Sequence, residues 1–194
     1  MPYSDLSARA DQPVIGDDAR VENDVQLLVS DARVASRRRA LTVGELVEDM
    51  ADRLCAGGRA NGGAGFALPF VQALVAGRAD SRRRIHVACD PALRLAAQQL
   101  AAVGMIVSEG VSNALEHGFP PGRDGDIWVR LSQADGRVTL RIRDNGIGMP
   151  DLDHAPNTGR GLIEALGDHL GGFARLGSVP FGGAEVSVTF PQSA

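Results

Sequence analysis

The chain has 194 residues, of which 44% are hydrophobic and 23% charged, a composition typical of a folded domain. Its net charge of -4 and pI near 5.5 give no general reason to expect nucleic acid as a partner. All 20 basic residues are arginine, which excludes a P-loop lysine, a Schiff-base lysine and a lysine general base.

The N-terminal forty residues predict a short flexible arm followed by a helix. Residues 1–13 are polar and lack the apolar core of a signal peptide. In residues 14–39, apolar side chains recur with helical spacing. No apolar run approaches the roughly 20 residues of a membrane span, and Cys55 and Cys89 belong to no metal-type cluster. We therefore expect a cytoplasmic protein that contacts no membrane.

A second helix is expected after Thr42, with Glu45 as its capping-box partner. Gly57-Gly58 should end this helix, and residues 66–78 resemble a shorter one. Two long helices joined by a tight connection predict an antiparallel hairpin with a wide apolar face. A second copy of the chain is the expected partner for that face, which would make a homodimer.

The periodicity changes near residues 79–83, where we place a domain boundary. A long helix should open at Asp90 or Pro91 and run through Glu116, and a hairpin turn is expected at 133–136. The remaining expected elements are strands at 84–89, 127–131, 138–142, 173–176 and 185–190 and a helix at 161–170. The fold class is therefore α+β: a flexible arm (1–13), a helical hairpin (14–80) and a two-layer α/β sandwich (81–194), whose mixed sheet has helices on one face.

Two polar residues of the long helix are candidates for chemistry. Glu109 and Asn113 are four positions apart and so share one helical face. Glu109 can polarise a hydroxyl or a water, and Asn113 offers the oxygen ligand that Mg²⁺ prefers. Most such pairs are solvated helix polars, so this pair alone is a weak signal.

Asp144-Asn145-Gly146-Ile147-Gly148 follows an expected strand and forms the second candidate. The carboxylate can accept a hydrogen bond from the exocyclic amine of adenine, and Gly146 and Gly148 allow a tight turn close to a planar ring. An ordinary turn is the competing interpretation, because Asn-Gly is a common turn dipeptide.

Thr158-Gly159-Arg160-Gly161 opens the next expected helix, and backbone N–H groups at such a start bind phosphate well. A glycine-containing helix start without a ligand is an equally good interpretation of this segment alone. Gly182-Gly183 then precedes the last strand, which carries Thr189.

Taken in this order and spacing, the motifs resemble the GHKL ATP-binding fold that DNA gyrase, a heat-shock chaperone, histidine kinases and MutL share, over roughly residues 83–191. The resemblance implies ATP and Mg²⁺ as ligands, with Asp144 reading adenine, and Gly146 and Gly148 forming its turn. It implies Asn113 as the Mg²⁺ ligand and Glu109 as the catalytic base. By the same resemblance, Thr158, Gly159 and Gly161 lie on the phosphate side, and Thr189 helps to hold the adenine.

The front of the chain extends the resemblance to the HWE and HRxxN class of sensor kinases, over about residues 14–191. Arg20-Val21-Glu22-Asn23 is similar to the motif that follows the phosphoacceptor histidine in that class. Here the preceding position is Ala19, and none of the four histidines lies on the first hairpin. Alanine has no nucleophile, so histidine autophosphorylation at this position is not expected.

The leading interpretation is an ATP-binding, histidine-kinase-like protein of bacterial two-component signalling, acting as a degenerate kinase or phosphotransfer-type regulator. A response regulator or another signalling protein is the expected partner. One alternative is an anti-sigma-type serine kinase that phosphorylates a protein antagonist, which Glu116 favours. Another is an interaction module that binds no nucleotide, so enzymatic activity itself remains open. The interaction module is suggested by Ser108 and Glu116, which depart from the sensor-kinase pattern.

Overall fold

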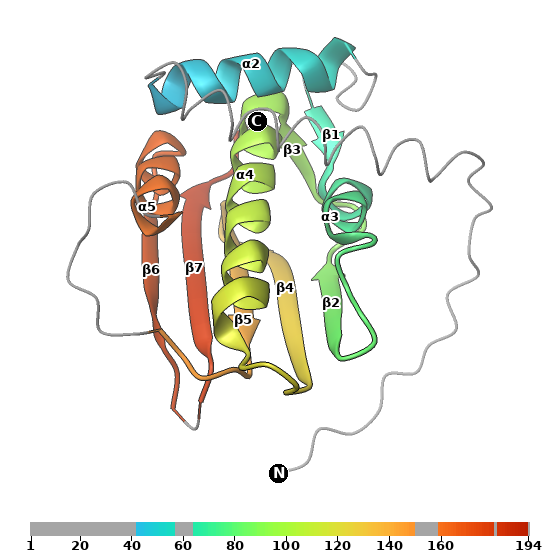
Figure 1. Cartoon of the computed structure of the whole chain (residues 1–194). Coiled ribbons are helices and arrows are strands. Elements are labelled where there is room, and N and C mark those ends of the chain that lie inside the picture. Colours follow the sequence, from blue (N-terminus) through green and yellow to red (C-terminus); the bar gives the residue numbers. More distant parts are fainter. Residues whose placement is uncertain (1–41, 57–63, 150–158, 181, 194) are drawn as a thin grey trace.

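The computed structural model describes residues 42–56, 64–149, 159–180 and 182–193 (Figure 1). Its main sheet has five strands in the order β2-β4-β5-β7-β6, in which β2 and β4 are parallel and the other neighbours antiparallel. The strands are β2 (Arg83–Cys89), β4 (Gly125–Ala134), β5 (Arg137–Asp144), β6 (Phe173–Ser178) and β7 (Ala184–Pro191). This arrangement confirms the expected mixed sheet.

Alternation of apolar and polar residues gives the sheet one buried face. The buried side chains come from every second position, for example Ile127, Val129 and Leu131 of β4. Strands β4 and β5 are joined by the expected hairpin turn, where Asp135 (φ 50°) and Gly136 (φ 69°) are both left-handed. Two left-handed residues define the type I′ geometry that matches the twist of the strands.

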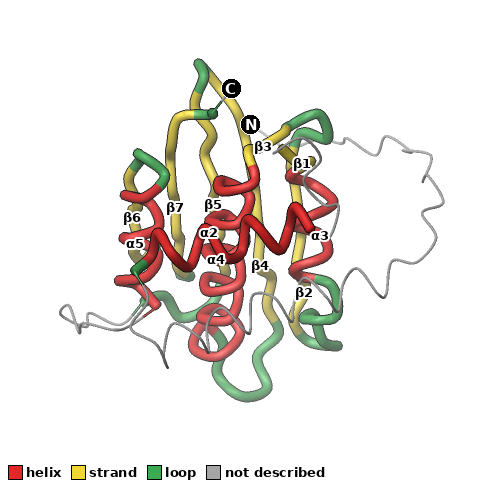
Figure 2. The backbone as a smooth tube through the Cα atoms, turned by 90° about the horizontal axis from the view of Figure 1, so that it is seen from above, coloured by secondary structure: helices red, strands yellow, loops and turns green. Residues whose placement is uncertain are grey.

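The described helices all lie on one face of the sheet, the buried one (Figures 1 and 2). They are α3 (Ala67–Val75), α4 (Ala97–Asn113) and α5 (Gly159–His169), with α2 (Val43–Ala56) lying across α4 and α5. Helix α4 is buried along almost its whole length, and Gly110 lies directly over Ile142 of β5. The layered α+β architecture is thus the one expected from the sequence.

Helix α2 begins with the predicted capping box. The backbone N–H of Glu45 donates to Thr42 Oγ1 (3.3 Å), and the Thr42 N–H donates to Glu45 Oε2 (2.8 Å). The apolar stripe of α2 packs into the same hydrophobic core as α4 and the sheet; it consists of Leu46, Val47, Met50, Ala51 and Leu54. The chain entering the sandwich is therefore anchored on it.

The predicted start of the long helix is wrong. At Asp90 the chain turns: the Ala92 N–H donates to Asp90 Oδ1 (2.8 Å) and the Leu93 N–H to the Asp90 carbonyl (3.0 Å). Strand β3 (Arg94–Ala96) follows and pairs with β1 (Ala64–Phe66), so α4 begins only at Ala97. Asp90-Pro91 forms a turn and does not start a helix, because the residues that follow it pair with the distant strand β1.

The same helix ends in a π-helical turn, η1 (Ala114–Gly118). Such turns are rare and frequently lie at functional sites. None of the described helices combines the length and apolar composition that crossing a bilayer requires. The expected arm, the first hairpin helix and Ala19 lie outside the described residues.

Candidate functional site

Asp144 ends strand β5 on the buried face, with only 5% of its surface exposed. Its Oδ1 accepts hydrogen bonds from the backbone N–H groups of Gly146 (2.8 Å) and Ala184 (3.3 Å). No hydrogen bond between described residues reaches its Oδ2. The carboxylate is thus held rigidly by one oxygen and can offer the other to a ligand's amine.

The glycine turn after Asp144 packs against the end of the long helix. A Cβ on Gly146 would overlap the carbonyl oxygen of Gly118, and the Ile147 N–H donates to that same oxygen (2.8 Å). Gly148 has a φ of 88°, a conformation that side chains of L residues rarely adopt. Both glycines are therefore required by this backbone.

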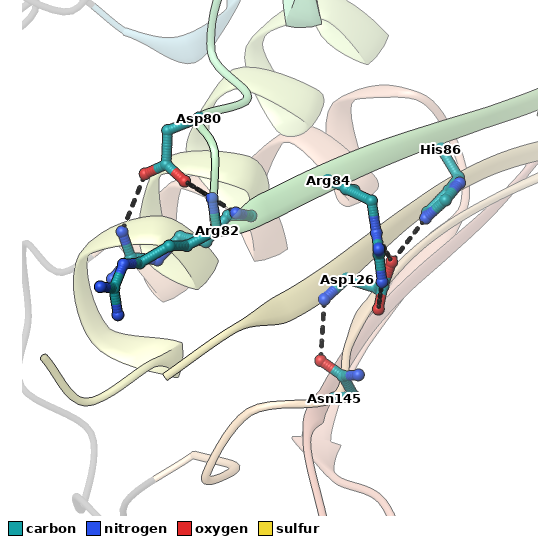
Figure 3. A network of polar contacts seen from close by, with 7 residues as sticks. Asp80, Arg82, Arg84, His86, Asp126 and Asn145 are labelled. Carbon is teal, nitrogen blue, oxygen red and sulfur yellow. Dashed lines mark hydrogen bonds and ion pairs between the residues drawn. The ribbon is translucent and has the colours of Figure 1, made fainter. Parts of the chain in front are cut away.

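Asn145 is anchored to the neighbouring strand by a polar network (Figure 3). Its Oδ1 accepts from the Asp126 N–H (2.9 Å), and its own N–H donates to the Asp126 carbonyl (3.3 Å). The Asp126 carboxylate accepts from Arg84 Nε (2.9 Å) and lies 2.7 Å from His86 Nε2. Hydrogen bonds from Arg84, and then from His86, hold the pKa of Asp126 well below its usual range.

Glu109 and Asn113 meet the start of α5. Glu109 is only 7% exposed. A Cβ on Gly159, the first residue of α5, would overlap Glu109 Oε1 and lie 3.0 Å from Asn113 Nδ2. The structure therefore brings together Glu109, Asn113 and Gly159, three of the residues expected to bind nucleotide.

The π-helical turn joins this group to Asp144. It follows Asn113 directly and ends at Gly118, where a Cβ would lie 3.5 Å from Asp144 Oδ1. One continuous stretch of helix thus carries the Mg²⁺ candidate at one end and lines the adenine candidate at the other. Gly118 was not found from the sequence, because it lies in no recognisable motif. Ala184 follows the Gly182-Gly183 motif, but the contact of its N–H with Asp144 was not expected.

The other two residues expected on the phosphate side are Thr158 and Gly161. Gly161 lies exposed on the first turn of α5, with nothing within 4 Å of a Cβ built there. Thr158 lies outside the described residues. The helix start therefore remains open toward solvent at Gly161, as a phosphate-binding end would need to be.

Thr189 is not brought to this group. Its Oγ1 lies 3.1 Å from Thr139 Oγ1, and both side chains alternate away from buried neighbours such as Val188 and Phe190. They thus point out of the sheet face opposite to the one that carries Asp144. The strand β7 group that contacts Asp144 is the Ala184 N–H. The expectation that Thr189 helps to hold the adenine is therefore wrong.

The residues fit the ligand types that were expected. No cluster of three or more His, Cys, Asp or Glu side chains suited to a metal occurs among the described residues. A Mg²⁺ here would rest on Asn113 and on ligand phosphates, which is the usual way proteins hold this ion with nucleotides. Asp144 Oδ2 supplies the acceptor that an adenine amine requires.

The family model for histidine kinase-, DNA gyrase B- and HSP90-like ATPases matches residues 98–194. Among curated proteins, the anti-sigma F factor of Bacillus licheniformis is 39% identical over 57 residues. That match covers 29% of this chain and 39% of the relative, and the anti-sigma F factor of Priestia megaterium gives a similar one, 40% over 58 residues. The chain thus spans about two fifths of the length of these relatives.

Solved structures share the fold over a longer stretch. The histidine kinase domain of the Erythrobacter litoralis EL346 blue-light activated histidine kinase superposes with a TM-score of 0.63 at 19% identity. The superposition covers 92% of this chain and 96% of that one. The histidine kinase domain of the E. coli osmosensor EnvZ gives a TM-score of 0.51 at 18% identity, covering 68% and 89%. At these identities the likeness concerns the fold alone.

Proposed function

Because this chain belongs to the histidine kinase-, DNA gyrase B- and HSP90-like ATPase family, we propose that it binds ATP with Mg²⁺ at the site around Asp144. The observation that supports this most is the Asp144 carboxylate, which is fixed through Oδ1 by two N–H groups. Its Oδ2 would accept the adenine amine, while the glycine turn would bring the backbone close to the ring.

The phosphate end of the ligand would lie at Asn113 and the start of α5. Asn113 would ligate the Mg²⁺, which neutralises phosphate charge when it is bound. The backbone N–H groups at the start of α5 would bind phosphate oxygens. Glu109 is buried beside them and would orient a hydroxyl or a water as a general base.

Isothermal titration with Mg-ATP tests this site. Asp144→Asn keeps the size of the side chain but sets an NH₂ or a neutral oxygen against the base. We expect affinity to fall about 5- to 150-fold, since an unmatched buried polar group costs about 1–3 kcal/mol. Asp135→Asn, at the exposed tip of the β4–β5 hairpin, is the matched control and should bind like the wild type.

The choice of base gives a second measurement. GTP offers a carbonyl oxygen where ATP offers an amine, and two oxygens facing each other cannot hydrogen-bond. GTP should therefore bind about 5- to 150-fold more weakly than ATP. Equal affinities for the two, or no heat from either nucleotide, would sink the proposal and favour a nucleotide-free interaction module.

At the level of cellular role, we propose a histidine-kinase-like regulator of bacterial two-component signalling that belongs to the HWE and HRxxN class. Ala19 stands where that class carries its phosphoacceptor, so ATP would regulate a partner and not phosphorylate this hairpin. The partner would be a response regulator or a similar signalling protein. Within the segment expected to form a dimerising hairpin, 14–80, the apolar stripe of α2 packs on α4, so a homodimer would form through the part that precedes α2, beside the ATP-binding unit, 81–194. Light scattering should then give the mass of a dimer.

A serine kinase of the anti-sigma type is the second candidate. It is favoured by the similarity to anti-sigma F factors and by the burial of Glu109 beside Asn113. Radiolabelled ATP, incubated with this chain and a candidate antagonist protein, separates the two roles. Transfer of label that disappears in Glu109→Gln, while ATP still binds, would favour the serine kinase. Nucleotide binding without any transfer would favour the regulator.

A further inference from the structure

The face of the sheet opposite the helices carries an unusual arrangement of arginines. We call this surface the outer face: the outward side chains of β2, β4, β5, β6 and β7. Arg130 lies directly opposite Arg141, Arg141 opposite Ser187, and Ser187 opposite Arg175. Like charges at directly opposed positions destabilise a sheet. A negatively charged partner would stabilise this row of arginines, above all at the directly opposed pair Arg130 and Arg141.

The arginines of the outer face are poorly neutralised by the fold itself. Among the described residues, no ion pair reaches Arg130, Arg141, Arg143 or Arg175. Among the described side chains of the outer face, two are acidic, Asp126 and Glu185. Asp126 already forms ion pairs with Arg84 and His86. The outer face is thus net positive on a chain whose total charge is -4.

The exposed aromatic side chains also gather on this face. Trp128 is 40% exposed and stacks on His86 with ring centroids 5.8 Å apart. Phe173 is 45% exposed, and the Arg175 guanidinium lies 5.3 Å from the centre of its ring. Exposed tryptophan, phenylalanine and arginine are the residue types enriched where proteins bind one another.

The chain contains a segment of matching character. Residues 1–18 comprise the expected flexible arm and the first five residues of the expected hairpin helix, and we call them the acidic arm. They hold four aspartates against a single arginine, with apolar residues between them. The aspartates are Asp5, Asp11, Asp17 and Asp18, and the apolar residues include Tyr3, Leu6, Val14 and Ile15. Carboxylates interleaved with apolar side chains complement arginines interleaved with aromatic rings.

The connection to the described part of the chain permits this contact. A Cβ on Gly44 would lie 3.9 Å from the ring of His169, which is four residues before Phe173, so the chain enters beside the β6 edge of the sheet. Residues 19–41 would span about 35 Å even if helical. The five strands together are only about 20 Å wide, so the arm can reach every arginine of the row.

We propose that the acidic arm docks on the outer face of its own sheet, with its aspartates against Arg130, Arg141 and Arg175 and its apolar residues against Trp128 and Phe173. Because the arm and the face belong to one chain, their effective concentration is in the millimolar range, so a weak contact suffices. Docking would cover the exposed aromatic rings and leave the nucleotide site on the other face untouched.

The composition of the chain provides the measurement. It has one tyrosine, Tyr3 in the arm, and one tryptophan, Trp128 on the outer face. Energy transfer from Tyr3 to Trp128 in the full-length protein, without nucleotide, therefore reports docking directly, with Tyr3→Phe as the blank. We expect transfer at low salt and its loss as salt approaches about 1 M, where the screening length falls to about 3 Å.

Two sets of full-length variants locate the contact. Arg141→Glu with Arg175→Glu should abolish transfer, whereas Arg53→Glu with Arg160→Glu, the same charge change at two helical arginines away from the face, should leave it unchanged. Asp11→Asn, Asp17→Asn and Asp18→Asn together should act like the first pair without altering the sheet. Transfer that survives these variants overturns the proposal. So does transfer that grows with protein concentration, which would mean an arm from a second copy, or the absence of any transfer at low salt.

Discussion

At the scale of single residues, the site depends on backbone positions that tolerate no side chain. Gly146 lies against the Gly118 carbonyl, and Asp144 is fixed by N–H groups from the loop that follows it and from the first residue of β7. Such contacts leave the Asp144 loop little freedom, so its geometry is set before a ligand arrives. Preorganisation of this kind reduces the cost of binding.

Gly146→Ala should therefore displace the loop. We expect ATP affinity to fall at least about tenfold and the free energy of unfolding to fall by about 1–3 kcal/mol, the usual cost of overpacking. Titration calorimetry and urea denaturation measure the two effects. Gly177→Ala, in β6, meets nothing within 4 Å and has no positive φ, so it should lower neither.

Asp126 gives the protein a pH dependence of known sign. Its pKa is lowered by Arg84 and His86, so its contribution to stability is present above the unfolded pKa of about 3.9 and is lost as pH falls through the lower folded value. Asp126→Asn should destabilise the protein at neutral pH and less so at pH 3. Denaturation at both pH values checks this, and a constant difference would contradict it. Asp135→Asn, exposed at the hairpin tip, is the control.

At the scale of elements, the distance between α4 and the sheet is set by a glycine, Gly110. A Cβ on Gly110 would lie 2.6 Å from Cδ1 of Ile142, so the helix approaches β5 as closely as the backbone allows. Glu109 and Asn113 lie on this same helix. The height of α4 above the sheet therefore fixes the distance between its functional groups and Asp144.

A double-mutant cycle tests this contact. Gly110→Ala should cost about 1–3 kcal/mol of unfolding free energy. Ile142→Val removes Cδ1, the atom that the new methyl would meet, and should on its own cost about 0.5–1.5 kcal/mol. The double variant should be more stable than the sum of the two changes predicts. Simple additivity in urea denaturation would show that the helix and β5 do not meet as described.

The elements that were predicted correctly are those whose structure depends on residues close to one another in the sequence. The Thr42 capping box and the Asp135-Gly136 turn depend on neighbours within three residues, and both are present. The start of α4 depends on pairing between β1 and β3, about thirty residues apart, and no local pattern carries that information. For the candidate site, Asp144 and Asn113 follow from motifs. The error at Thr189 has a simple cause, since its place between Val188 and Phe190 indicates the outward face.

At the scale of the whole molecule, α2 and the sandwich share one hydrophobic core. Leu54 of α2 is fully buried in the same cluster as Leu100 and Ile106 of α4. Helix α2 also contacts α5, whose first residue lies against Glu109. A change in how the preceding chain is held could thus reach the phosphate end of the site through two packed helices.

Leu54→Ala should therefore destabilise the whole structure and not α2 alone. The expected loss is about 2–5 kcal/mol, as for other buried leucines, and helix and tertiary signals should disappear in one transition. Circular dichroism and Trp128 fluorescence followed during the same melt provide the two signals. The neighbouring exposed Cys55→Ala is the control. Separate transitions for the two probes would mean that α2 unfolds independently.

The parallel pairing of β2 with β4 has a consequence for the order of folding. Every other neighbouring pair in the sheet is antiparallel, and β4 and β5 are joined by a two-residue turn, whereas β2 reaches β4 only through β3, α4 and η1. Contacts between distant segments form slowly because the loop between them must first be closed. The segment that closes this loop carries Glu109 and Asn113. Pairing of β2 with β4 should thus follow formation of the β4–β5 hairpin, and hydrogen-exchange labelling during refolding should protect β4 and β5 before β2.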